Sequence, residues 1–357
     1  MALFSASRTA VGLDIGSSGV KLMELAQDPK TGKHRLVNFG TARLPPEAIV
    51  DGAVMNANAV VDVVRELLTK HRVKVKQVTT SVSGHAVIIK RINLPTMTEE
   101  ELEESIQWEA EQYIPFDIND VYLDVQILPG NTDDPGQMEV LLVAVRKALV
   151  NEYQALLQQA GLQPTVIDID AFALANMFEL NYDISNESVA LVNIGASNVN
   201  IHVIRRGVSA FTRDLTMGGR QFTEEIQRTL NISYEEAEAL KVGGDDKDRQ
   251  AVVPEEIERV LSQVGETLAT EIHRSLDFYL STSSDTQLSR IYLSGGASRT
   301  PGLARAISNL TNLPTELVDP FRRIQIDERQ FNPAFLNDIG PQAAIVVGLA
   351  LRRPGDR

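Results

Sequence analysis

The chain has 357 residues, 43% of them hydrophobic and 23% charged, so it is long enough for about two globular domains. It has no cysteine, which excludes disulfides, thiolate metal sites and thiol catalysis. The net charge of −14 disfavours a nucleic-acid partner, and we expect no local basic patch that would offset it. Residues 343–351 form the longest apolar run near the C-terminus, which is too short for direct membrane insertion.

The first 94 residues predict a mixed α/β domain that begins with a β-hairpin. Apolar residues at 11–14 and 19–25 give two strand patterns, joined by a tight turn rich in glycine and serine. Apolar residues at helical spacing follow at 58–71, and further strand patterns lie at 73–81 and 87–94.

Residues 84–161 have the pattern of a compact insert with its own small sheet. Thr98 and Glu101 form a capping box, which opens a helix that Pro115 ends. Trp108 lies off the apolar stripe of this helix, so we expect it to pack on a neighbouring element. The other elements expected in the insert are strands at 121–128 and 140–145 and a helix at 150–160.

The opening pattern repeats about 180 residues later. Residues 12–22 (GLDIGSSGVKL) and 191–201 (LVNIGASNVNI) align with four identities and place Asn193 opposite Asp14. Two similar strand-turn-strand units predict two related domains that face one another.

The remaining segments continue the alternation of strands and helices. Asp170 stands where a helix N-cap is expected, and Ser233 with Glu236 forms a second capping-box pattern. The other expected elements are a strand at 165–168, helices at 171–180 and from 254 onward, a strand at 290–293, and a last helix at 340–351.

Each copy of the repeat carries a turn suited to binding an anion. A strand ending in Asp14 runs into the turn 16–19, whose successive N–H groups and hydroxyls can cradle a phosphate. Lys21 is placed to reach that phosphate, and Asp14 to hold a hydrated Mg²⁺. One such turn fits an ordinary hairpin equally well, but the second copy at 193–198 predicts a clamp on both sides of a polyphosphate.

A third glycine-rich junction, Gly295 and Gly296, stands at a strand end and suits close approach of a nucleoside, although a plain strand-helix turn fits it equally. We expect Gly16→Val or Gly295→Val to abolish nucleotide binding and to leave the fold largely intact. The sequence contains no P-loop motif. No GxGxxG motif follows the first strand, which argues against a dinucleotide-binding fold. The histidines show no ligand spacing that predicts a metal site.

Taken together, these motifs resemble the actin-like ATPase superfamily, which includes actin, Hsp70, sugar kinases, FtsA and MreB. Residues 12–22 and 191–201 resemble its two phosphate motifs, 291–306 its adenosine motif, and 165–175 and 340–351 its two connecting segments. The resemblance implies an α/β fold class: duplicated actin-like (ribonuclease H-like) domains facing a nucleotide cleft.

The insert resembles subdomain 1C of FtsA. Its sequence is similar to the PilM family of type IV pilus assembly proteins, with INLP at 92–95 and EAEQYIPF at 109–116. The segment VIDID at 166–170, which follows the insert, shares this similarity. The implied subdomains are 1A at 1–84 and 162–187, 1C at 85–161, 2A at 188–220 and 285–357, and 2B at 221–284.

The resemblance implies ATP and Mg²⁺ as cofactors. The superfamily usually carries Asp where this chain has Asn193, so we expect nucleotide binding with at most slow hydrolysis. Glu238 and Lys241 fall where the family contacts the adenosine. The alternative interpretation is an ordinary ion pair on the helix surface. Asp14 and Asp168 are weak catalytic candidates, and Asp14 is the metal candidate. The expected cofactor-binding residues are Asp14, Gly16, Ser17, Ser18, Gly19, Lys21, Asn193, Gly195, Ala196, Ser197, Asn198, Gly218, Gly219, Glu238, Lys241, Gly295, Gly296 and Ala297.

The resemblance implies a cytoplasmic ATP-binding adaptor of the type IV pilus inner-membrane platform, active in twitching motility. In the family the cytoplasmic N-terminal tail of PilN binds between the first domain and subdomain 1C, and we expect coupling to motor or platform proteins, with self-association left open. Two alternatives remain on the same fold: a small-molecule kinase with Asp168 or Asp170 as its base, and an FtsA-like filament protein.

Overall fold

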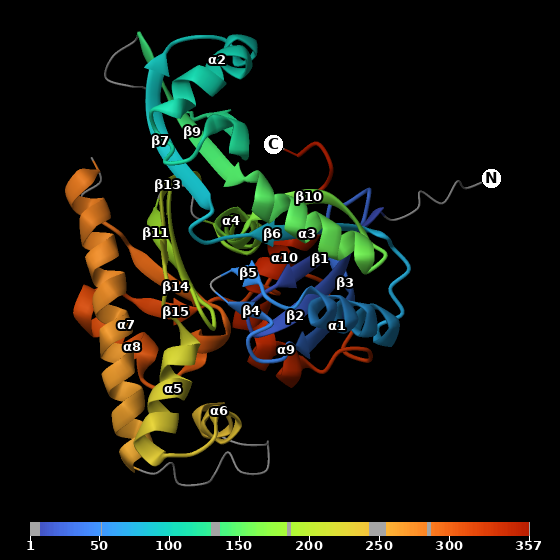
Figure 1. Cartoon of the computed structure of the whole chain (residues 1–357), viewed down its shortest axis with the longest axis vertical. Helices are drawn as coiled ribbons and strands as arrows, with labels where there is room; N and C mark the ends of the chain where they lie inside the picture. The colour runs from blue at the N-terminus through green and yellow to red at the C-terminus, as the bar shows by residue number, and fades with distance from the viewer. Residues whose placement is uncertain are drawn as a thin grey trace.

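The computed structural model describes residues 8–50, 52–129, 136–183, 187–242, 255–283 and 287–356. These residues form two five-stranded mixed sheets with helices between and around them. A smaller three-stranded sheet with its own helix projects from one end of the molecule (Figure 1).

The first large sheet has the strand order β10-β6-β1-β2-β3. β1, β2 and β3 are antiparallel neighbours, whereas β1, β6 and β10 run parallel. The expected hairpin is confirmed, and its register pairs Asp14 with Lys21. The strands are β1 (Arg8–Ile15), β2 (Gly19–Gln27), β3 (His34–Arg43), β6 (Gln77–Val82) and β10 (Gln163–Ile169).

The second large sheet repeats the first strand for strand, with the order β15-β14-β11-β12-β13 and the same parallel and antiparallel pairings. Its hairpin register pairs Asn193 with Asn200, the positions of Asp14 and Lys21 in the first copy. The predicted duplication is therefore confirmed. The strands are β11 (Ser188–Ile194), β12 (Val199–Arg205), β13 (Val208–Leu215), β14 (Arg290–Ser294) and β15 (Thr315–Leu317).

Two helices, α4 (Asp170–Asn181) and α10 (Ala344–Leu351), join the two halves of the molecule. One apolar cluster takes side chains from both helices, from β2 and β3, and from β11 and β12. α10 is apolar all round, as a helix enclosed on all sides must be. It packs so closely that a Cβ on Gly348 would lie 1.7 Å from Ala173 O, and one on Gly12 would lie 2.7 Å from Val346 O.

One helical stretch of the described chain, Pro333–Leu351, has the length and hydropathy of a membrane-spanning helix, by those two measures alone. It consists of α9 (Pro333–Ile339), the 3₁₀ turn Gly340–Ala343 and α10. Because 61% of its most apolar window is buried inside the fold, the same composition is accounted for by its place in the core.

The outer faces of the two sheets are covered by separate groups of helices. α1 (Ala57–Lys70) and α3 (Lys147–Gln159) pack on the first sheet. The second sheet is covered by α5 (Gly219–Leu230), α6 (Tyr234–Val242), α7 (Glu255–Thr282) and α8 (Leu303–Thr311). The short strands β4 (Ile49–Val50) and β5 (Ala53–Val54) pair with each other.

The insert is a three-stranded antiparallel sheet of order β7-β9-β8, covered on one face by α2. The predicted capping box at Thr98 and Glu101 is present and opens α2. α3, which we expected within the insert, instead places Tyr153, Leu156 and Leu157 in the core of the first domain. The elements are β7 (Val87–Pro95), α2 (Glu99–Glu111), η1 (Ile118–Asp120), β8 (Val121–Ile127) and β9 (Gln137–Arg146).

Two local expectations were wrong. The N-cap of α4 is Ile169, and Asp170 is the first helical residue, because its carboxylate accepts a hydrogen bond from Ser81 instead of capping the helix. Trp108 does not pack on a neighbour: it is 80% exposed, because Leu102, Ile106 and Ala110 alone form the buried face of α2. The predicted subdomain boundaries stay predictions.

Candidate functional site

The first phosphate turn, residues 16–19, joins β1 to β2. The Gly16 N–H donates to Gly19 O at 3.0 Å and closes the turn. Beneath it, Lys21 Nζ donates to Asp14 Oδ2 at 2.8 Å, and both side chains are largely buried. A Cβ on Gly16 would lie 3.9 Å from Lys21 Nζ, so the ammonium lies directly below the turn, where a bound phosphate would meet it.

The second phosphate turn, residues 195–198, joins β11 to β12 and is closed in the same way, by the Gly195 N–H donating to Asn198 O at 2.9 Å. Ser197 Oγ is buried in this turn and has no hydrogen-bond partner. Leaving a buried hydroxyl unpaired costs about 1–3 kcal/mol, which a phosphate oxygen would relieve. The turn therefore has the chemistry expected of an anion site.

A chain of hydrogen bonds runs from the base of the second turn into the first domain. Ser294 Oγ donates to Asn193 Oδ1 at 3.3 Å, and Asn193 Nδ2 donates to Asn200 Oδ1 at 2.9 Å. Asn200 Nδ2 donates to Asp214 Oδ1 at 2.9 Å, and Asp214 Oδ2 accepts from the Gly84 N–H at 2.8 Å. We call these four side chains and the Gly84 amide the amide relay.

The start of α5 is fitted against the second turn. Gly219 N donates to Gly195 O at 2.9 Å, and Arg220 N donates to Ala196 O at 2.8 Å. A Cβ on Gly218 would lie 2.6 Å from Gly195 O, so only glycine permits this contact. The first amides of α5 thus hold the turn in place.

The third junction lies against the same turn. Gly295 has φ +87°, and a Cβ there would lie 2.4 Å from Ile194 O and 2.8 Å from Asn193 Oδ1. A side chain at this position is strained and collides with β11, so Gly295→Val cannot leave the fold intact. Gly16 is different, because a Cβ there meets nothing closer than 3.5 Å. Gly296 likewise has room, its nearest neighbour being Gln342 at 3.6 Å, and Ala297 is buried beside Gly219.

Glu238 and Lys241 lie on α6 next to this junction, and they are not a solvated surface pair. Lys241 Nζ donates to Glu238, to Thr223 Oγ1 at 2.9 Å and to Gly219 O at 3.2 Å. Its side chain is 12% exposed, and burial lowers the pKa of Lys241 while Glu238 opposes that shift. Arg43, from the first domain, lowers the pKa further.

The two aspartates of the first connecting segment lie in different surroundings. Asp168 is buried and paired with Arg352 Nε at 3.0 Å, a contact that gives no support to a catalytic role. Asp170 accepts from Ser81 beside the first phosphate turn. Burial, aided by the carboxylates of Asp14 and Asp214, raises the pKa of Asp170 to about 6. Of the two, Asp170 is the carboxyl that interacts with the carboxylates of Asp14 and Asp214.

The donors for Mg²⁺ are sparse. Among the described residues no group of three or more acidic, histidine or cysteine side chains is arranged to hold a metal ion. One oxygen of Asp14 is already paired with Lys21, so Asp14 fits a metal only through its other oxygen or through water. A magnesium ion here would need the phosphates of a nucleotide as its main ligands.

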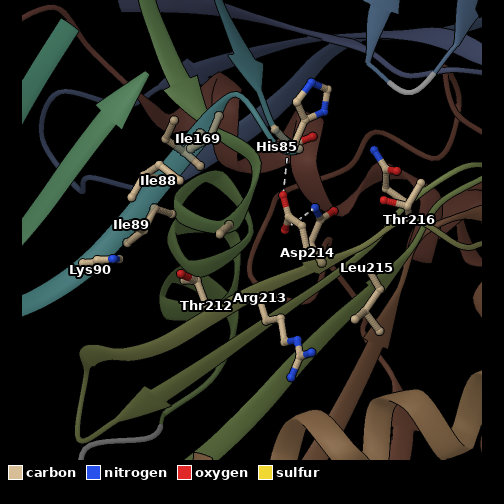
Figure 2. A pocket seen from close by; sticks show the side chains of 16 residues that line it. His85, Ile88, Ile89, Lys90, Ile169, Thr212, Arg213, Asp214, Leu215 and Thr216 are labelled. Carbon is tan, nitrogen blue, oxygen red and sulfur yellow. Dashed lines mark hydrogen bonds between the residues drawn. The ribbon is translucent and has the colours of Figure 1, made fainter. Parts of the chain in front are cut away.

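A cavity of about 310 Å³ lies between the edge strands β7 and β13, next to the interdomain cleft. Figure 2 shows Ile88, Ile89 and Lys90 of β7 on one side, and Thr212 and Arg213 of β13 on another. It shares only Asn198 with the phosphate turns, so it is a separate pocket beside the candidate nucleotide site. Gly84 and Asp214, the far end of the amide relay, are part of its wall.

Sequence reasoning missed Asn200, Asp214 and Thr223. Asn200 had a usable signal, because the repeat places it opposite Lys21, the cation of the first copy. Asp214 and Thr223 had none, since only the packing of β13 on β12 and of α6 on α5 brings them to the site.

Comparisons with known proteins identify the family and the fold. The family model described as type IV pilus assembly protein PilM matches residues 12–354. The chain belongs to this family. A solved structure described as a PilM-PilN type IV pilus biogenesis complex matches with a TM-score of 0.83 and 32% identity, over 97% of this chain and 99% of that one.

More distant relatives of this PilM-family chain share the fold. Cell division protein FtsA of Bacillus subtilis is 26% identical over 256 residues, which cover 65% of this chain and only 57% of that protein. MreB5 of Spiroplasma citri bound to ADP matches with a TM-score of 0.52 and 15% identity, over 96% of this chain and 94% of that one. The fold is thus the predicted pair of actin-like domains with an FtsA-like insert, and the chain is a type IV pilus assembly protein.

Proposed function

We propose that this PilM-family protein is an ATP-binding adaptor of the type IV pilus platform, which joins a nucleotide in the interdomain cleft to a peptide partner at the insert. The observation that carries the proposal is the pair of matching turns, 16–19 and 195–198, with the unpaired Ser197 hydroxyl in the second. Two such turns from duplicated sheets suit the two sides of a polyphosphate.

The cofactor we propose is ATP with Mg²⁺. Lys21 would neutralise phosphate charge on the first-domain side, and Ser197 would donate on the second. Gly295 and Gly296 would face the nucleoside, with Glu238 and Lys241 next to them. The ion would supply charge compensation for the phosphates, with Asp14 as its protein partner through water.

Hydrolysis should be slow. In place of the superfamily's second aspartate the cleft has Asn193, whose Oδ1 accepts from Ser294 and whose Nδ2 donates to Asn200. Asp214 does not take over that position, since it already accepts hydrogen bonds from Asn200 and Gly84. Binding and domain closure, rather than turnover, are then the useful output of the site.

The partner we propose is the cytoplasmic N-terminal tail of PilN, and PilN is the protein named together with PilM in the related complex. The half-buried side chains of Val87, Ile88 and Ile89 could receive apolar anchors of an extended peptide along the edge of β7. The tail would hold the protein at the inner face of the inner membrane. The motor proteins would bind the protein according to its nucleotide-dependent domain arrangement.

The amide relay offers a route between the two ligands. Its first members lie under the phosphate turn, and its last hydrogen bond holds Gly84, where the chain enters β7 and the insert. A nucleotide that moves the second domain would stretch or tighten this bond. The coupling requires that the peptide bind the two domain arrangements unequally.

Calorimetry with ATP and Mg²⁺, and with a synthetic PilN tail, tests the proposal. The unaltered protein should bind both, and Gly16→Val should lose ATP binding while it keeps its thermal unfolding temperature and the tail. Gly265→Ala is the control, because its new methyl would reach only Leu303, 3.8 Å away and far from the cleft. Unchanged ATP affinity in Gly16→Val would place the nucleotide elsewhere. If the PilN tail protected only residues beyond 188 from hydrogen exchange, the peptide site would also lie elsewhere.

A further inference from the structure

A basic surface lies outside the cleft, contrary to the expectation that the sequence contains no basic patch. Residues 65–76 carry five lysines and arginines and one glutamate, a formal charge of +4 in a chain whose total is −14. We call Arg65, Lys70, Arg72, Lys74 and Lys76 the basic cluster. All five are exposed.

The backbone gathers these side chains on one side. α1 ends at Lys70, and Arg72 takes φ +51°, which reverses the chain while the Arg72 and Val73 amides donate back to Thr69 and Leu68. In the extended segment that follows, Val73 and Val75 pack toward the core of the first domain. Alternation then turns Lys74 and Lys76 outward together with Arg72.

The cluster surrounds a hollow of about 550 Å³. Arg65, Arg72, Lys74 and Lys76 contribute to its wall, and its apolar lining residues are Leu68, Val73 and Ala160. Among the described residues no carboxylate forms an ion pair with Lys70, Arg72, Lys74 or Lys76. Arg65 makes only a 3.9 Å contact with Asp62 and a hydrogen bond to Gln159 O. The positive charge is therefore left for a ligand to compensate.

The end of α1 accounts for only part of this charge. A helix C-terminus favours Lys70 and Arg72 through its negative partial charge, but the effect falls off within the last turn. Lys74 and Lys76 lie beyond it and are repelled by their neighbours. An anion at the hollow would relieve that repulsion.

The surroundings indicate which anion. Compact phosphate sites use free backbone amides at a helix N-terminus, whereas this hollow lies at a C-terminus whose amides are already bonded. Its lining includes no aromatic side chain on which a base could stack. Long cationic side chains around an apolar floor instead suit phosphate groups presented by a surface. A basic patch facing a membrane is attracted by about 1 kcal/mol per lysine or arginine, and acidic residues farther from it than a Debye length of roughly 10 Å are screened.

We propose that the basic cluster seats the headgroups of anionic phospholipids, so that this face of the first domain lies on a membrane surface. The contact needs neither the nucleotide nor the PilN tail. It adds to the protein-protein tether proposed above and fixes which face of the molecule is turned to the bilayer.

The test is co-sedimentation of the full chain with vesicles of phosphatidylcholine alone and of phosphatidylcholine mixed with phosphatidylglycerol or cardiolipin. The protein should sediment only with the anionic vesicles, and high salt should release it. Arg72→Glu/Lys74→Glu should lower the partition by at least about tenfold. The matched control is Lys30→Glu/Lys33→Glu in the exposed turn between β2 and β3, which should bind as the unaltered protein does.

Equal sedimentation with neutral vesicles, or an equal loss in the control variant, would overturn the proposal. Tighter binding of inorganic phosphate or a DNA duplex than of vesicles, at equal phosphate concentration, would assign another ligand and overturn it as well. Calorimetry of the Arg72→Glu/Lys74→Glu variant should show unchanged binding of ATP and of the PilN tail. A failure of the lipid contact is thereby distinguished from a failure of the proposed function.

Discussion

At the residue scale, the two copies of the phosphate motif differ in the pair beneath the turn. Asp14 and Lys21 form an ion pair, whereas the equivalent Asn193 and Asn200 form an amide-amide hydrogen bond. Each amide has a donor and an acceptor end, so the chain of bonds from Ser294 to Asp214 has a fixed direction. In the ion pair of the first copy, Lys21 can only donate and Asp14 can only accept, so the bond cannot continue through the lysine to an acceptor end.

Asn193→Asp should therefore destabilise the protein. The aspartate has no N–H to offer Asn200 Oδ1, and two oxygens then face each other in a buried place, which costs about 1–3 kcal/mol. Adding Asn200→Lys should restore most of the loss, because the lysine can donate to residue 193 and to Asp214, as Lys21 does to Asp14. Urea unfolding of both variants measures this, and a fully stable single variant would show that the direction of the bonds is unimportant.

Asp170 gives a second prediction at this scale. Its raised pKa, about 6 against 3.8, means that the native state binds more protons than the unfolded state between these pH values. The free energy of unfolding then falls as pH rises through this window, and the penalty is complete above pH 6. Asp170→Asn should remove it, stabilising the protein by at most about 3 kcal/mol at pH 8 and by roughly half of that at pH 5.

Unfolding experiments at the two pH values check this expectation. The exposed Asp62, replaced in the same way, should change stability by no more than about 0.5 kcal/mol at either pH. A gain for Asp170→Asn that is equal at both pH values would show that the carboxyl of Asp170 does not titrate in this range.

At the element scale, the crossing of α4 and α10 holds the two sheets together. Gly348 permits it, since a Cβ there would lie 1.7 Å from Ala173 O, far inside van der Waals contact distance. This contact is between backbones, so no change of rotamer can relieve a clash. The two helices must then separate, and with them the shared core that draws on both domains.

Gly348→Ala should consequently cost more than the 1–3 kcal/mol typical of an overpacked core and should lower the melting temperature steeply. Gly265→Ala, in the middle of α7 with space around it, should raise stability by up to about 1 kcal/mol through helix propensity. Thermal unfolding of the pair separates the packing effect from the effect of adding a methyl group. Equal melting temperatures would mean that the helices can slide apart without loss.

At the scale of the whole molecule, the proposed function depends on communication between the cleft and the insert. Asp214 belongs to the second domain and accepts the Gly84 amide of the first, at the wall of the pocket beside β7. If this bond follows domain closure, ATP and the PilN tail change each other's affinity by one common factor, because such coupling is reciprocal.

Asp214→Asn should bring that factor close to one, since an amide that keeps its bond to Asn200 presents N–H, not oxygen, to Gly84. The measurement is calorimetry of the PilN tail with and without ATP. Thr216→Ala is the control, because Thr216 lines the pocket but is not in the amide relay, and it should keep the coupling. Full coupling in the Asp214→Asn variant would show that the relay is not the route.

The sequence by itself was sufficient for the periodic and repeated features. Hydrophobic periodicity located the hairpins, α1, α2 and α7, and the duplicated turns predicted facing domains, because these signals are local or are visible as a repeat. Only the tertiary structure decided what depends on contacts between distant segments. Four such features join residues far apart in the chain: the packing of α3 in the first core, the close contact of Gly295 with β11, the burial of Lys241 and the hydrogen bond from Gly84 to Asp214. Their partners leave no periodic trace in the sequence, since each contact is set by how whole elements pack and not by the spacing of neighbours along one element.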